Sequence, residues 1–309
     1  MAGKSRIPFR VSPMLATLVA KPFHAENWVY EEKYDGVRLL AYKEGSRVRL
    51  LSRNAKDNTA RFPNIAEAIA KLKPVTLLLD GEVVVFDRKD ISRFQLLQEG
   101  KGEATFAVFD CLYVDGKDLR RKPLSERRPI LETVVRAGGP LLLSRRLDKN
   151  GLKAYQIAKR RGYEGLVAKD LSSPYVEGRS KFWLKVKVHQ EDEFVIGGFT
   201  APQGSRQHFG ALLLGAYENG KLLYVGKVGT GFDRANLRSL FQKFKPLIRA
   251  NSVFAYPPRE KNTTFLAPQL VAQISYQELT AEQKLRQPVF LGLRDDKSAK
   301  EVVLPTAAK

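Results

Sequence analysis

Several kinds of residue are scarce in this sequence, and each scarcity excludes a class of protein. The 309 residues include one cysteine, Cys111, which excludes an internal disulfide framework and predicts a reducing, cytoplasmic setting. The three histidines, His24, His189 and His208, are scattered, which argues against a dedicated zinc site. No apolar run approaches the ~20 residues that span a bilayer. Residues 1–10 also lack the apolar core of a signal peptide.

Acidic side chains are in deficit as well. The chain has 53 lysines and arginines against 33 aspartates and glutamates, which gives a formal net charge of +20. A merely solvated basic surface is the simplest alternative, but the size of the excess and its spread along the chain favour a nucleic-acid partner. No long amphipathic basic helix and no lipidation motif is present, so a membrane partner is not expected.

The length predicts two domains, which we place at residues 1–189 and 190–309. Residues 1–20 are expected to form a loose arm with a short apolar anchor at Met14, Leu15 and Leu18. The next part alternates short strands with helices, which predicts an α+β domain of antiparallel sheets and flanking helices. The expected strands are 28–32, 37–42, 47–51, a pair within 75–86 bent at Asp80-Gly81, 106–114, 166–169 and 182–188. The expected helices are 62–72, 124–136 with Ser125 as its N-cap, and 153–161 ending at Gly162.

After residue 189 the pattern changes to short strands joined by glycine-rich turns. Strands are expected at 191–200, 211–217 and 221–228, with a helix at 234–244 and further short strands from Glu278 onward. About five strands and one helix predict a small β-barrel of the OB type. Gly215 and Gly220-Lys221 match the start of a phosphate-binding P-loop, but Leu222 replaces the required Ser or Thr and no helix follows, so a hairpin turn is expected there.

The strongest chemical signal is the segment from Glu31 to Arg38. Lys33 stands at the end of an apolar strand and is followed by Asp35, Gly36 and Arg38. A lysine amine is a nucleophile only when neutral, and nearby cations, a metal ion or burial lower its pKa toward that state. Attack on a nucleotide α-phosphate would form a phosphoramidate. Taken alone, the segment is equally compatible with a charged surface hairpin.

Three further segments favour the catalytic interpretation. Glu82 and Glu164 each lie in or beside an apolar strand, where a carboxylate is costly unless it is paired or binds a metal. Lys185 and Lys187 share one face of a strand because side chains alternate. Two such lysines repel each other unless an anion, such as a triphosphate, lies between them.

These segments belong to a set of short motifs whose order along the chain resembles that of the covalent nucleotidyltransferase superfamily. The motifs are Glu31-x-Lys33-x-Asp35-Gly36-x-Arg38, Ser52-Arg53-Asn54, Asp80-Gly81-Glu82, Phe109-Asp110, Glu164-Gly165-Leu166-Val167-x-Lys169, Lys185-x-Lys187 and Arg294-x-Asp296-Lys297. The superfamily contains ATP-dependent DNA ligases, RNA ligases and mRNA capping enzymes. Residues 209–214, 224–232 and 289–294 resemble the ligase domain of bacterial end-joining DNA ligases. The resemblance implies that this chain is a stand-alone version of that domain.

The resemblance implies a role for each matched residue. Lys33 would carry AMP, with Asp35, Lys185 and Lys187 also in the catalytic group. The lysine pair would hold the α-phosphate. Nucleotide or DNA-end contacts are implied for Glu31 beside the adenine, Arg38, Arg53, Glu82, Phe109 stacked on the base, and Lys169. Glu82 and Glu164 would bind Mg²⁺ or Mn²⁺. Arg294, Asp296 and Lys297 would orient the leaving pyrophosphate.

The resemblance therefore implies an ATP-dependent DNA ligase that seals nicked or broken double-stranded DNA, as a monomer and with a Ku-type end-binding protein as partner. Three alternatives stay open at this point. They are an RNA ligase, a capping-type guanylyltransferase, and a non-catalytic nucleic-acid binding module that has kept the fold.

Overall fold

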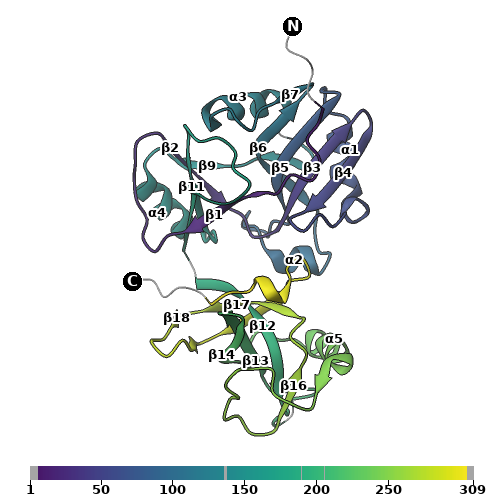
Figure 1. The fold of residues 1–309 in the computed structure, drawn as a ribbon, viewed down its shortest axis with the longest axis vertical. Coiled ribbons are helices and arrows are strands. Elements are labelled where there is room, and N and C mark those ends of the chain that lie inside the picture. Colours follow the sequence, from purple (N-terminus) through teal and green to yellow (C-terminus); the bar gives the residue numbers. More distant parts are fainter. Residues whose placement is uncertain (1–5, 136–137, 189, 205, 305–309) are drawn as a thin grey trace. The chain divides into compact units, whose positions relative to one another are not determined.

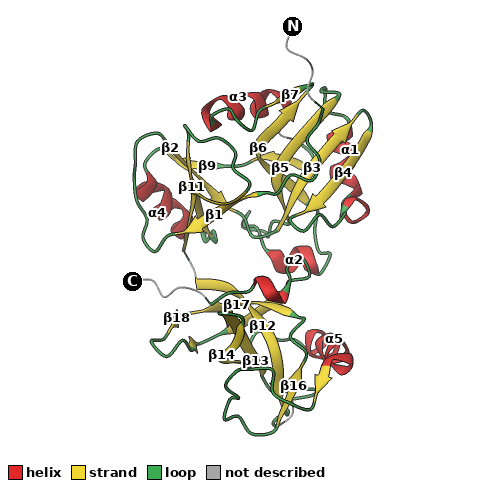
Figure 2. Ribbon diagram, in the orientation of Figure 1, coloured by secondary structure: helices red, strands yellow, loops and turns green. Residues whose placement is uncertain are grey.

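The computed structural model describes residues 6–135, 138–188, 190–204 and 206–304. The chain divides into two compact units, residues 1–188 and 189–309 (Figure 1). His189, at the predicted boundary, lies outside the described residues, as do residues 1–5 of the predicted arm. The α+β fold class is confirmed, with mostly antiparallel sheets and few helices (Figure 2). Every helix in the described residues is too short or too polar to cross a membrane.

Two mixed sheets build the first unit. One has the strand order β1-β11-β10-β2-β9, with bounds Met14–Leu18, Gly178–Lys187, Gly165–Asp170, Trp28–Lys33 and Arg146–Asp148. The other has the order β4-β3-β5-β6-β7, with β8 also paired to β6. Its bounds are Arg47–Ser52, Val37–Glu44, Thr76–Val84, Thr105–Val114 and Lys117–Asp118, and Leu141–Leu143 for β8. Only β1–β11 and β6–β8 run parallel in the described part of this unit.

Side-chain alternation decides what each face of these sheets contacts. In β3, Leu39 and Ala41 enter the core beneath helices α1 (Pro63–Ala70) and α3 (Leu124–Val134), while Leu40 and Tyr42 enter a second core on the opposite face. That second core also contains Trp183 of β11, so the two sheets meet there. Helix α4 (Gly151–Arg161) covers the outer face of the first sheet, and the short α2 spans Phe94–Gln98.

The second unit is an OB-type region around one seven-stranded sheet with the path β14-β13-β12-β16-β15. Its long strand β12 pairs with β13, β16 and β17, and β20 pairs with β17. The bounds are Gln190–Thr200, Leu212–Glu218, Lys221–Val228, Ile248–Arg249, Thr263–Leu266, Val271–Tyr276 and Val289–Leu293 for β12–β17 and β20. Helix α5 (Arg234–Phe244) packs on its core, and β18 (Glu278–Leu279) with β19 (Leu285–Arg286) forms a separate hairpin.

Three local predictions were wrong. The expected loose arm includes β1, because Met14 is fully buried and its strand pairs with β11, some 160 residues later in the chain. Residues 75–86 hold one strand, β5, in place of the predicted pair, although its register with β6 shifts at the predicted Asp80-Gly81 position. Helix α3 begins after Pro123, and no side chain caps it, in place of the predicted Ser125. The predicted last residue of that helix, Arg136, lies outside the described residues.

Candidate active site

Lys33 lies at the C-terminal end of β2, on the face of the first sheet that is turned away from α4. The register pairs Lys33 with Gly165 of β10, and Gly165 in turn with Lys187 of β11. Tyr30, which has the opposite orientation along β2, packs with α4. The sheet therefore sets Lys33 and Lys187 on one face, on either side of a residue without a side chain.

The amine of Lys33 forms an ion pair with the Glu164 carboxylate. The Lys33 side chain is 19% exposed and that of Glu164 is 10% exposed, so solvent reaches the pair. Burial lowers the pKa of Lys33, but Glu164, assisted by Asp35 and Glu82, outweighs burial and raises the pKa above its ordinary value. In this state the amine is a cation, and activation as a nucleophile requires that this negative field be neutralised.

Asp35 and Glu82, the other two carboxylates that raise the pKa of Lys33, come from different elements. The Asp35 carboxylate accepts a hydrogen bond from the backbone N–H of Phe94 at the start of α2 (3.0 Å), and its own N–H donates to Ser92 Oγ (3.0 Å). Glu82 lies in β5, opposite Arg38 of β3. The structure therefore gathers three predicted carboxylates, Asp35, Glu82 and Glu164, near the predicted lysine.

Lys185 and Lys187 lie on β11, and both are partly exposed. They share a face with Trp183, as the alternation predicts, and Trp183 is buried in the core between the sheets. Gly165 permits the close approach of β10 to this strand, because a Cβ there would lie 2.1 Å from the carbonyl oxygen of Val186. A side chain at this position would push Lys187 away from Lys33.

Arg38 is held by Asp80 of β5. Its Nε and Nη2 donate to the two carboxylate oxygens at 2.6 and 2.7 Å, and Asp80 also accepts a hydrogen bond from the Tyr175 hydroxyl (2.6 Å). Asp80 is completely buried, so this pairing accounts for an acid inside an apolar strand. The Arg38 guanidinium carbon also lies 4.2 Å from the ring centroid of Phe109.

Phe109 and Lys169 form a wall beside this pair. The Lys169 ammonium lies 4.4 Å from the ring centroids of both Phe109 and Trp183, within range for a cation–π contact. Phe109 is buried, and both Arg38 and Lys169 lie against its ring.

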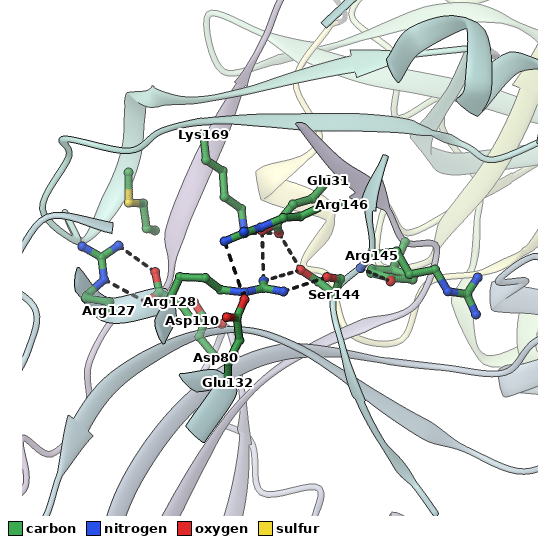
Figure 3. Close-up of polar contacts among 12 residues, drawn as sticks. Glu31, Asp80, Asp110, Arg127, Arg128, Glu132, Ser144, Arg145, Arg146 and Lys169 are labelled. Atoms are coloured by element: carbon green, nitrogen blue, oxygen red, sulfur yellow. Dashed lines mark hydrogen bonds and ion pairs between the residues drawn. The ribbon is translucent and has the colours of Figure 1, made fainter. Parts of the chain in front are cut away.

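Glu31 is more enclosed than its predicted place beside a base indicates. Its Oε1 accepts from Arg128 (3.0 Å), and its Oε2 accepts from the Ser144 hydroxyl (2.6 Å) and from Lys169 (2.7 Å), as Figure 3 shows. Burial raises the pKa of Glu31, but Lys169 and Arg128 outweigh burial and hold it below its ordinary value. The carboxylate is therefore ionised and fixed.

The remaining predicted residues are Arg53 in the first unit and three residues in the second unit. Arg53 is exposed in the turn after β4. In the second unit, Arg294 donates to both oxygens of Asp296 (2.8 Å each), and its side chain is 9% exposed. Lys297 forms an ion pair with Glu193 of β12. Both predicted cations of this motif are thus paired within their own unit.

Four residues of the cluster were not predicted from the sequence: Arg128, Ser144, Tyr175 and Trp183. Arg128 lies in a charged helical segment that resembles a solvated surface helix, and Ser144 lies in an irregular segment. Trp183 had a usable signal, because it shares the strand alternation of Lys185 and Lys187.

Two family models match this chain. Residues 13–187 match the family model described as ATP dependent DNA ligase domain, and residues 205–297 match that described as ATP dependent DNA ligase C terminal region. The chain is 41% identical over 313 residues to the multifunctional non-homologous end joining protein LigD of Pseudomonas aeruginosa, covering 97% of this chain and 37% of that protein. The protein of the same name from Mycolicibacterium smegmatis is 37% identical over 310 residues, covering 97% and 40%. The chain thus spans less than half the length of these relatives.

Solved structures extend the comparison to the fold. The mycobacterial DNA ligase D complexed with ATP and MES superposes with a TM-score of 0.74 at 36% identity, covering 97% of this chain and 100% of that chain. The ligase domain from M. tuberculosis LigD gives a TM-score of 0.55 at 36% identity, covering 96% and 99%. Because a family model matches more than half of the chain and this likeness runs along nearly all of it, the chain belongs to the family of ATP-dependent DNA ligases.

Proposed function

We propose that this chain seals breaks between a 5′-phosphate and a 3′-hydroxyl in duplex DNA, through AMP carried on Lys33. The observation that carries the proposal is the position of Lys33, whose amine is partly exposed, paired with Glu164, and on the same sheet face as Lys187. The amine would attack the α-phosphate of ATP and displace pyrophosphate, and the AMP would then move from the amine to the 5′-phosphate of the DNA. Attack by the 3′-hydroxyl on that 5′-phosphate would form the phosphodiester and release AMP.

In the first step, the positive charges of Lys185 and Lys187 on β11 would neutralise the phosphate oxygens of ATP. Phosphoryl transfer depends on positioning and on neutralising the phosphate oxygens, and Lys185 and Lys187 present two cations on the face that bears Lys33. Asp35 holds the start of α2 against the end of β2, which orients the strand that ends in Lys33. Glu31, Arg38, Phe109 and Lys169 are proposed to contact the nucleoside.

The residues around Lys33 fit a divalent metal ion. Glu164 and Glu82 supply carboxylate oxygens, which Mg²⁺ and Mn²⁺ prefer, and both raise the pKa of the Lys33 amine. Among the described residues, no three His, Cys, Asp or Glu side chains are arranged to hold a metal ion by themselves, so oxygens of the nucleotide phosphates would have to complete the coordination of such an ion. Such an ion would neutralise the carboxylates, so that burial lowers the pKa of Lys33 toward its nucleophilic form.

The other predicted roles are proposals of the same kind. Arg53 would contact the DNA end, and Arg294, Asp296 and Lys297 would serve the leaving pyrophosphate. The relatives are named for non-homologous end joining, so we propose repair of broken DNA ends in the cytoplasm, as a monomer acting with a Ku-type partner.

Transfer of labelled AMP tests the central proposal. Incubation with α-labelled ATP and Mg²⁺ should label the protein on a denaturing gel, and pyrophosphate should remove one adenylate from the intact mass. Lys33→Ala should abolish the label but leave DNA affinity nearly unchanged. Labelling by GTP in place of ATP would indicate a guanylyltransferase, and sealing of nicked RNA in place of nicked DNA would indicate an RNA ligase. A folded chain that takes no label and seals nothing would be a binding module.

A further inference from the structure

Donors from three separate segments hold the Glu31 carboxylate. Arg128 comes from α3, Ser144 from the segment between β8 and β9, and Lys169 from β10 (Figure 3). A carboxylate has about four lone-pair positions. Three are filled here, two of them on Oε2, and the remaining one is on Oε1. The orientation of the carboxylate is therefore fully determined by its protein neighbours.

Because the cluster is buried, the Glu31 carboxylate keeps this orientation only while its charge is compensated by the cations around it. The side chains of Glu31, Arg128 and Lys169 are 3%, 5% and 3% exposed, and a charge in such a place is costly without partners. Arg128 also connects the buried ion pairs to the surface, because its Nε donates to Glu132 (2.8 Å), whose side chain is 43% exposed. Two cations and two anions thus form one chain from the interior to the surface.

The same cluster fixes the aromatic wall of the candidate active site. Lys169 donates to Glu31 and lies 4.4 Å from the ring centroids of both Phe109 and Trp183. If Glu31 turns, Lys169 loses the partner that compensates its buried charge, and its contact with the rings changes. The position of Lys169 therefore depends on the donors to Glu31.

Arg128 connects helix α3 to the residues that hold the Glu31 carboxylate. Besides Glu31 it donates to Ser144 at the hydroxyl and at the carbonyl oxygen (3.0 Å each). The preceding residue, Arg127, anchors α3 through a completely buried pair with Asp110 (2.8 and 2.7 Å). The helix is thus fixed to the sheet, and Arg128 reaches from it to a nucleotide-site residue.

We propose that Arg128, acting with Ser144, is a positioning residue for the nucleotide: it orients Glu31 and, through Glu31, places Lys169 against Phe109 and Trp183. This inference rests on the proposed function. Because the cluster acts on the nucleoside and not on the phosphorus, its loss should weaken ATP binding in the ground and transition states alike. Such a change raises the half-saturating ATP concentration more than it lowers the rate at saturation.

Single-turnover adenylation of the full chain at varied ATP tests the proposal. Arg128→Met should raise the half-saturating ATP concentration by about tenfold or more, the usual effect of losing a charged, buried hydrogen bond. Ser144→Ala should raise it in the same direction by a smaller factor. The matched control is Arg146→Met. Arg146 is opposite Glu31 in the pairing of β2 with β9, and its side chain lies 3.7 Å from Glu132. The change leaves the three donors to the Glu31 carboxylate in place, so this variant should behave like the unaltered chain.

A double variant separates positioning from a general structural role. If Arg128 acts through Glu31, adding Arg128→Met to Glu31→Gln should have little further effect on the ATP dependence. An undiminished effect in that background would overturn the proposal, as would an unchanged ATP dependence in Arg128→Met or, if that variant does not fold, in Ser144→Ala. If the unaltered chain takes no AMP, the proposed function itself fails. If it is labelled and Arg128→Met matches Arg146→Met, only this inference fails.

Discussion

Replacing Gly165 by alanine tests the geometry of the candidate active site with one added methyl group. Gly165 of β10 lies between Lys33 of β2 and Lys187 of β11 in the sheet register. A Cβ at this position would lie 2.1 Å from the Val186 carbonyl oxygen and 3.0 Å from the Cα of Lys187. Both obstacles are backbone atoms, so a rotamer change cannot relieve the clash.

The size of the displacement sets the expected effect. Contacts of this kind are not found below 3.0 Å, so β10 and β11 must separate by about 0.9 Å. A misplacement of about 1 Å in a catalytic group costs on the order of 100-fold in rate. Overpacking of this kind also destabilises a fold by about 1–3 kcal/mol. We therefore expect Gly165→Ala to remain folded and to transfer AMP to Lys33 roughly 100-fold more slowly in a single-turnover assay.

Gly45→Ala provides a control for stability alone. Gly45 has a φ of +61° in the turn between β3 and β4, and an added Cβ there meets nothing within 4 Å. Alanine in this left-handed conformation costs about 1 kcal/mol, without moving the site. A folded Gly165→Ala chain that adenylates within about threefold of the unaltered rate would refute the argument from strand spacing.

Two further predictions concern buried or paired carboxylates. Burial, opposed by Arg145, raises the pKa of Glu32 from 4.5 to about 7, so between these pH values the folded chain binds more protons than the unfolded chain and the free energy of unfolding falls as pH rises. Glu32→Gln should remove this pH dependence, and at pH 8 its free energy of unfolding should exceed that of the unaltered chain by ~3 kcal/mol. If urea titration gives the unaltered chain the same free energy of unfolding at pH 5 and at pH 8, the prediction is contradicted. Glu193→Gln removes the partner of Lys297 and should lower the half-saturating ATP concentration for adenylation by up to about fivefold. A rise in that concentration would show that the pair supports the active arrangement.

Local patterns predicted much of the fold, and the errors arose where distant segments meet. Helix α5 and the hairpin of β3 and β4 follow from spacing and turn residues within a few positions. Strand β1 could not be predicted in this way, because its partner β11 lies far along the chain. Strands β16 and β17 were missed for the same reason, since their pairing with β12 gives them no local turn signal.

The ordered motifs located most of the candidate active site, but they did not reveal how its charges are balanced. Lys33 and Glu164 stand far apart in the sequence, and their ion pair follows from the pairing of β2 with β10. The raised pKa of Lys33 could not be predicted, because it is the difference between burial and three carboxylates. Arg128 was missed because nothing in its helix distinguishes a buried arginine from a solvated one.

The parallel pairing of β1 with β11 also constrains how the first unit is made. Met14 is opposite Gly178, and Leu18 is opposite Lys185, so this edge of the sheet cannot close until the ribosome has delivered residues beyond 185. At about 5–20 residues per second, the N-terminal strand waits on the order of ten seconds or more for its partner. During that interval the side chain of Met14, which is fully buried in the folded chain, lacks its partners on β11, so β1 cannot pair before the strand that bears Lys185 and Lys187 has been made.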